Sequence, residues 1–217
     1  NEVSGDDVVI KGNDAIKFED SGGTKMTLDG GNLGIGETTP VAELHIKQGD
    51  AGDVDTHANV ALILEGSGGT FLQFQTPSSA TDVGLLFGDP AERDAGAIKY
   101  DHTNDSFKFH TDDVEKMRLT STGQLGIGTG GNVDELLHVQ NDSNNAVIKI
   151  EAGSSSTGAR LQLISATNDT GDINFGDSGD TNIGRIKYDH TDNYLAIHTN
   201  DTERMRIDSS GNVGIGV

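Results

Sequence analysis

The sequence repeats itself, and this constrains the fold more than any other feature. Residues 98–128 and 186–216 align without a gap at an offset of 88 and are identical at 17 of 31 positions. A partial third copy lies near the N-terminus, in Lys25–Leu28, Asn32–Gly36 and Glu43–Ile46. Because a repeated supersecondary unit cannot bury its apolar face alone, such units must stack on one another or on a partner.

The repeats predict three segments. We expect a partial first repeat over 1–58, a full repeat over 59–144 and a second full repeat over 145–217, with the last one cut short at its C-terminus. Since the chain starts at Asn1 rather than Met, we interpret it as part of a longer protein.

Each repeat reads as strands separated by turns. Apolar residues alternate with other residues, which is typical of half-buried strands, and clusters of Gly, Asp, Ser and Thr mark the turns. Helix signals are scarce; Pro40–His45 could begin a single helical turn or lead into a strand. The positions that we expect to build the repeat are Phe107, Phe109, Met117, Leu119, Leu125, Gly126, Ile127 and Gly128, with their counterparts Leu195, Ile197, Met205, Ile207, Val213, Gly214, Ile215 and Gly216.

Two glycines in each Gly-Ile-Gly motif require an explanation, because glycine weakens a strand by about 0.5–1 kcal/mol relative to alanine. Either the backbone adopts an unusual φ angle, or another backbone approaches closely. We predict close packing between chains there, so that Val at Gly126 or Gly214 impairs assembly more than Val at Gly153, which we place in a loop.

The composition predicts a thin core. Val, Ile, Leu and Phe make up 51 of 217 residues, and the chain has no Trp, close to the level at which charged chains fail to fold. Association of identical chains would supply the missing core and cover strand edges that otherwise aggregate. We therefore predict an all-β, elongated repetitive fibre, a parallel homotrimer with intertwined sheets, as a triple β-helix or a β-prism. A two-layer sandwich and a β-solenoid also fit the pattern.

Charge and composition exclude several classes. The formal net charge of −20 repels phosphates, so we expect no nucleic-acid partner. The absence of Cys excludes disulfides, thiolate metal sites and cysteine nucleophiles. The longest aliphatic run, Val60–Leu64, is far shorter than the roughly 20 residues of a membrane-spanning helix.

The segment Glu203–Gly216, which reads ERMRIDSSGNVGIG, resembles a repeat of phage tail-fibre and related virion-fibre proteins. The Thr/Pro linker Glu37–Pro40 and the Leu-His-Ile segment Glu43–Ile46, which follow Gly34-Ile35-Gly36, are similar to that family's usual continuation. The resemblance implies a homotrimeric β-rich shaft on the virion, outside the cell, next to adjoining fibre or virion proteins. Such shafts often end in a receptor-binding tip or an auto-cleaving chaperone domain, and neither module is evident here.

Metal-binding interpretations of the sequence have less support than the structural interpretation. Histidines recur at His102, His110, His190 and His198 and at His45 and His138, and on a threefold axis they could ring a metal, although no local metal-binding spacing occurs. Asp172, Asp177 and Asp180 do not keep the nine-residue spacing of calcium β-rolls. We assign no metal, no cofactor and no catalytic residue.

The scarce positive charges also recur in the repeats. We expect them to pair with Asp and Glu of the same or a neighbouring chain, or to bind an anionic glycan; they are Lys99, Lys116, Arg118, Lys187, Arg204 and Arg206. Exposed pairs of this kind contribute only about 0–1 kcal/mol each.

Three functional hypotheses follow. The first is a shaft segment of a phage tail fibre, a trimeric spacer that presents a tip which binds a host glycan or protein. The second is the stalk of a non-viral extracellular filament or bacterial surface adhesin. The third is a spike that cleaves carbohydrate with paired carboxylates, disfavoured because residues that recur in every repeat do not form one asymmetric active site.

Overall fold

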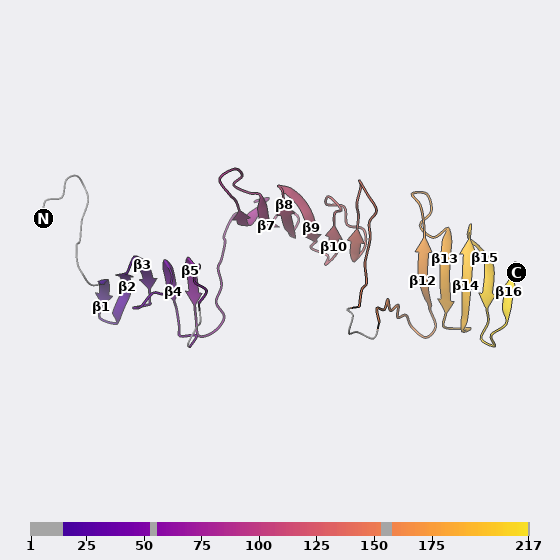
Figure 1. The fold of residues 1–217 in the computed structure, drawn as a ribbon, viewed down its shortest axis with the longest axis horizontal. Helices are drawn as coiled ribbons and strands as arrows, with labels where there is room; N and C mark the ends of the chain where they lie inside the picture. Colours follow the sequence, from indigo (N-terminus) through magenta and orange to yellow (C-terminus); the bar gives the residue numbers. More distant parts are fainter. Residues whose placement is uncertain (1–14, 53–55, 153–157, 217) are drawn as a thin grey trace. The chain divides into compact units, whose positions relative to one another are not determined.

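The protein is all-β. The computed structural model describes residues 15–52, 56–152 and 158–216, and in these ranges it contains sixteen strands and no helix. The strands form three open sheets, two of them mixed and the third antiparallel, and none of the three closes into a barrel (Figure 1). The chain divides into two compact units, residues 1–144 with the first two sheets and residues 145–217 with the third.

The first sheet has the order β1-β2-β3-β4-β5. The first three strands pair antiparallel, and β4 and β5 are then added in parallel. The strand bounds are β1 Ile16–Asp20, β2 Gly23–Asp29, β3 Asn32–Ile35, β4 Leu44–Lys47 and β5 Leu62–Glu65.

The second sheet has the order β11-β10-β9-β8-β7-β6. Its strands pair antiparallel except for the last pair, β10 and β11, which is parallel. The strand bounds are β6 Val83–Phe87, β7 Gly96–Asp101, β8 Ser106–Thr111, β9 Val114–Leu119, β10 Leu125–Ile127 and β11 Leu137–Val139.

The third sheet repeats β6–β10 in the order β12-β13-β14-β15-β16, all antiparallel. The strand bounds are β12 Thr170–Phe175, β13 Gly184–Asp189, β14 Tyr194–Thr199, β15 Thr202–Ile207 and β16 Val213–Ile215. The two-residue turns Asp112-Asp113 and Asn200-Asp201 join β8 to β9 and β14 to β15, with positive φ at both positions. This geometry matches the twist of paired strands and suits Asn and Asp.

The strand registers align apolar side chains in two rows on one face of every sheet. In the first sheet the rows are Ile16, Leu28, Leu33, Leu44, Leu62 and Phe18, Met26, Ile35, Ile46, Leu64. In the second they are Val83, Tyr100, Phe107, Leu119, Leu125, Leu137 and Leu85, Ile98, Phe109, Met117, Ile127, Val139. In the third they are Gly171, Tyr188, Leu195, Ile207, Val213 and Ile173, Ile186, Ile197, Met205, Ile215. We call this side of each sheet the apolar face and the other side the polar face.

A β-bulge occurs at the same place in every sheet. The register skips Lys25 in β2, Lys116 in β9 and Arg204 in β15. An extra residue reverses the alternation beyond it, so Glu115 shares the polar face with Arg118, three residues away. Simple alternation would have placed these two side chains on opposite faces.

The glycines of the Gly-Ile-Gly motif have two different roles within one chain. The second glycine has a positive φ, 74° at Gly36, 74° at Gly128 and 73° at Gly216, and its N–H donates to the bulge residue's carbonyl. The first glycine allows a close approach: a Cβ on Gly126 would lie 2.5 Å from Thr129 Oγ1 and 2.6 Å from Val133 Cγ2. The close contact predicted between chains at Gly126 is therefore already made within the chain. Gly153 lies outside the described residues.

The prediction for Pro40–His45 is resolved in favour of the strand: Val41–Glu43 bend, and β4 begins at Leu44. The expected segments 1–58, 59–144 and 145–217 remain a prediction. We note that β5, at Leu62–Glu65, belongs to the first sheet, and that the second compact unit starts at Asn145.

Candidate functional site

The apolar faces are a candidate interaction surface, because many of their large apolar side chains are exposed to solvent. Even on interior strands, Leu28 of β2 is 44 % exposed, Leu119 of β9 is 41 % exposed and Ile197 of β14 is 39 % exposed. Phe107 and Ile127, which we expected to build the repeat, are also exposed. Large exposed apolar patches of this kind mark interaction sites.

The buried residues lie elsewhere. Within residues 15–52, 56–152 and 158–216, the buried apolar side chains are those of Ala42, Ala97, Ala196 and Pro40. Ala97 and Ala196 lie on polar faces, as does the fully buried Thr27. A single chain thus covers part of its polar faces and leaves its apolar faces open, the reverse of an ordinary globular sheet protein.

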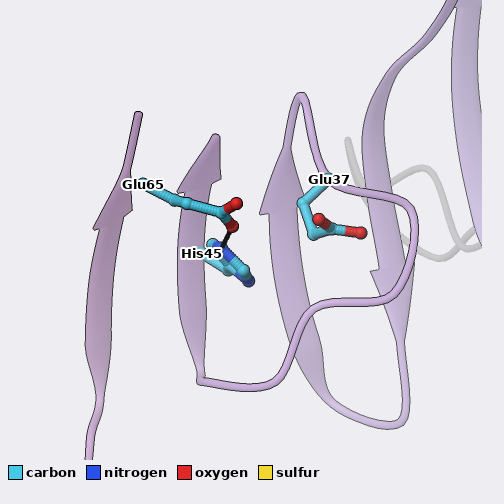
Figure 2. Close-up of side chains that lie close together, drawn as sticks. All are labelled: Glu37, His45 and Glu65. Carbon is cyan, nitrogen blue, oxygen red and sulfur yellow. Dashed lines mark hydrogen bonds and ion pairs between the residues drawn. The ribbon is translucent and has the colours of Figure 1, made fainter. Parts of the chain in front are cut away.

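The polar face of the first sheet carries a buried charge cluster, which consists of Glu37, His45, Lys47 and Glu65. Figure 2 shows Glu37 on the segment between β3 and β4, His45 on β4 and Glu65 at the end of β5, with the Glu65 carboxylate directed at the His45 ring and Glu37 nearby. His45 Nε2 lies 2.8 Å from Glu65 Oε2, and both side chains are more than nine-tenths buried.

Lys47 joins the two carboxylates. Its Nζ lies 3.2 Å from Glu37 Oε2 and 3.1 Å from Glu65 Oε1. Backbone groups complete the arrangement: the N–H of Thr39 donates to Glu37 at 2.7 Å, and the N–H of Ala51 donates to Glu65 at 2.9 Å. The cluster therefore fastens the segment after β3 and the segment after β4 to the parallel strands.

The same contacts shift the pKa values of the cluster. The Thr39 backbone N–H, followed by Lys47, lowers the pKa of Glu37 to about 2. The Ala51 backbone N–H, followed by Lys47, lowers the pKa of Glu65. Hydrogen bonds to Glu65 and Glu37 raise the pKa of Lys47. Each shift stabilises the charged form, as expected where opposite charges and backbone donors surround an ion.

A metal centre is the alternative interpretation of this cluster. One nitrogen of His45 and one oxygen each of Glu37 and Glu65 lie within 4.8 Å of one another, the only such triad in the described part of the chain. However, the Lys47 ammonium occupies the cation position between the two carboxylates, and every carboxylate oxygen needed by a metal already accepts a hydrogen bond. We therefore assign this cluster a structural role.

The other sheets carry simpler ion pairs on their polar faces. Lys108 Nζ lies 2.6 Å from the buried carboxylate of Asp101, which lowers the pKa of Asp101. Arg118 donates to both oxygens of Glu115, at 2.7 Å and 2.6 Å. The expected pairing of the repeat's basic residues with its own acids is thus observed for Arg118.

The third sheet shows the same pairing. Arg206 donates from Nε and Nη2 to the two Glu203 oxygens, each at 2.7 Å, and Lys187 Nζ lies 3.2 Å from Asp189 Oδ2. The guanidinium of Arg206 also lies over the Tyr194 ring, 3.7 Å from its centroid.

Some of the remaining histidines and aspartates make local contacts, whereas neither of the two buried ring nitrogens of His110 has a hydrogen-bond partner among the described residues. His102 and His190 pack edge-on against Tyr100 and Tyr188, at 4.9 Å in each case. Asp177 accepts hydrogen bonds from the N–H groups of Gly179 and Asp180 and so closes a turn. Asp172 accepts one from the Thr170 hydroxyl.

Sequence reasoning missed the charge cluster. His45 was considered only as one of the recurring histidines that could ring a metal on a threefold axis, and Glu65 lies twenty residues away. The signal that could have found it is the parallel pairing of β4 with β5, which sets His45 beside Ile63 and Lys47 beside Glu65.

Comparison with known proteins gives no further identification. No family model matches the sequence, and no match is found among the curated proteins. No helix in the described ranges is long and apolar enough to cross a membrane.

Proposed function

We propose that this chain is a structural shaft segment of a phage tail fibre, a homotrimeric spacer that holds a host-binding tip away from the virion. The observation that carries the proposal is the recurrence of the same two-row apolar face on all three sheets, exposed in the single chain. Burial of apolar surface contributes roughly 25 cal/mol per Å², so faces of this kind favour association.

Identical copies are the partner that best fits these faces. The rows recur in the same order along the chain, so parallel copies in register bring each sheet against its own equivalent. Closed rotational symmetry also gives every copy the same contacts, which is the usual arrangement of homo-oligomers. Three copies follow from the resemblance of Glu203–Gly216 to virion-fibre repeats.

The polar faces fit the outside of such a shaft. They carry the charge cluster of the first sheet and the Arg–Glu pairs of the other two. With a net charge of −20 per chain, this outer surface keeps separate fibres apart in solution.

A stalk of a non-viral extracellular filament or surface adhesin would use the same faces. The neighbouring sequence of the full-length protein separates the two: a virion-attachment module supports the fibre, and a secretion signal or cell-wall anchor supports the stalk. A carbohydrate-cleaving spike is the third candidate. Cleavage of host glycan that is lost on replacing one Asp or Glu would favour the spike.

The experiment is the mass of the assembled protein. Analytical ultracentrifugation at several concentrations is expected to give three copies for the wild-type chain. Leu119→Asp combined with Ile207→Asp places charges on two apolar faces and is expected to give a monomer. The control, Ser121→Asp combined with Ser209→Asp, adds the same charge at exposed turns and is expected to stay trimeric.

A folded monomer at all concentrations would overturn the proposal. A stable dimer would retain the apolar faces as an interface but refute the three-chain shaft, because two sheets packed face to face would then cover them. Equal masses for the variant with charged apolar faces and the variant with charged turns would show that the apolar faces do not form the contacts between chains.

A further inference from the structure

A parallel strand follows the Gly-Ile-Gly strand in the first two sheets. After β3, residues 36–43 cross the polar face and β4 pairs parallel with β3. After β10, residues 128–136 do the same and β11 pairs parallel with β10. The bonds Leu33 N–H to Glu43 C=O, 2.8 Å, and Leu125 N–H to Leu136 C=O, 2.8 Å, start the two parallel pairs in the same way.

In the third sheet, β16 has the same sequence pattern and no such neighbour among the described residues. Two bonds flank its pairing with β15, from the Asp208 N–H to the Asn212 carbonyl and from the Gly216 N–H to the Arg204 carbonyl. In an antiparallel pair, residues alternate between bonded and non-bonded positions, so Val213 and Ile215 direct their N–H and C=O groups away from β15. These groups correspond to those of Leu125 and Ile127, which bind β11 and the residues beside it.

An open groove of about 540 Å³ lies beside this edge, lined by Glu203, Arg206, Asp208, Asn212, Val213 and Gly214. The counterparts of Arg206 and Gly214 in the second sheet are Arg118 and Gly126, at the repeat offset of 88. There the crossing segment fills the space: Thr129 and Val133 lie against Gly126, and Gly131 lies beside the Arg118 guanidinium. The groove is thus the position that a crossing segment occupies in the second sheet.

We propose that β16 is an acceptor edge for a parallel strand, supplied by a peptide segment of the Thr129–Gln140 pattern. Its Thr and Val side chains would fill the groove over Gly214 and Arg206. Its Leu-His-Val strand would pair with Val213 and Ile215 and extend the two apolar rows. Main-chain bonds would supply affinity and the groove would supply sequence preference, as in other strand-addition complexes. The proposal does not rest on the trimeric shaft.

The test uses the full chain and a synthetic peptide with the sequence of Thr129–Gln140 (TGGNVDELLHVQ) at about 0.15 M salt, where repulsion between the acidic partners is screened beyond roughly 8 Å. Amide hydrogen exchange resolved to single residues is the readout. Saturating peptide is expected to slow exchange at Val213 and Ile215 at least tenfold. Gly214, whose N–H faces β15, is expected to change little and serves as the internal reference.

Matched variants locate the peptide. A scrambled peptide and a peptide with Val133→Asp are expected to bind at least tenfold more weakly, and neither changes the folded protein. Gly214→Val is expected to abolish the protection, whereas Gly171→Val is expected to leave it. Gly171 lies on β12 at the opposite edge of the sheet, where an added Cβ meets only Ser165 Oγ at 3.9 Å.

Three results would overturn the proposal. The first is no added protection at Val213 with saturating peptide. The second is equal protection by the scrambled peptide. The third is protection that rises with protein concentration in the absence of peptide, because β16 would then pair with another copy of the chain. The first two results do not depend on the mass of the assembly, so this proposal and the shaft can fail separately.

Discussion

Replacing Gly126 by Ala tests why the repeat places glycine in a strand. The new Cβ would lie 2.5 Å from Thr129 Oγ1 and 2.6 Å from Val133 Cγ2, whereas ordinary contacts begin at 3.4 Å. The Thr129 and Val133 side chains, or the crossing segment that carries them, must therefore move by almost 1 Å. Overpacking of this kind costs about 1–3 kcal/mol.

Gly171→Ala is the matched control, because Gly171 also lies inside a strand but has room for a Cβ. Both variants gain the preference for alanine over glycine, about 0.5–1 kcal/mol. That gain cancels in the comparison, so the free energies of unfolding of the two variants should differ by the overpacking cost, about 1–3 kcal/mol.

Native-state hydrogen exchange is the suitable assay, since separate sheets need not unfold in one transition. At fixed protein concentration, the free energy of opening is measured at the amides of β10 and β11. Adding Val133→Ala to Gly126→Ala removes one of the two clashing groups and is expected to recover at least about 0.5 kcal/mol of the loss.

Two outcomes would refute this reasoning. If alanine is tolerated equally at Gly126 and Gly171, the close approach does not require glycine. If Val133→Ala recovers nothing while Gly126→Ala weakens assembly, the glycine serves contacts between chains, as the sequence first indicated.

Two further predictions concern the charge cluster. Lys47→Met leaves the Glu37 and Glu65 carboxylates without their shared cation. The free energy of opening at β4, measured by hydrogen exchange, should therefore fall by about 2–3 kcal/mol. An unchanged value would show that the ion pairs contribute nothing. Because the folded-state pKa of Glu37 is about 2 against an ordinary value of 4.5, its contribution is complete above about pH 4.5 and is lost as the pH falls toward 2. The stability of the wild type, measured by circular dichroism during acid unfolding, should therefore fall more steeply over this pH range than that of Glu37→Gln. Parallel acid-unfolding curves for the two proteins would contradict the assignment.

The sequence alone indicated the strands and their two faces, except beyond each bulge, where the alternation reverses. Alternation with period two places Met117 with Leu119 and Leu125 with Ile127, and the observed registers keep all four on one face. A gapless repeat at an offset of 88 also required the third sheet to copy the second. These features are local or periodic, so no knowledge of distant contacts was needed.

Tertiary structure decided the role of the glycines and the charge cluster. The first glycine of the motif accommodates residues that cross above it, and the clash at Gly126 involves Val133, seven residues away. His45 meets Glu65 only because β4 and β5 lie parallel, after an intervening segment that carries no periodic signal. Contacts between residues distant in sequence depend on how strands are paired and connected in space, and alternation within a single strand contains no information about that pairing.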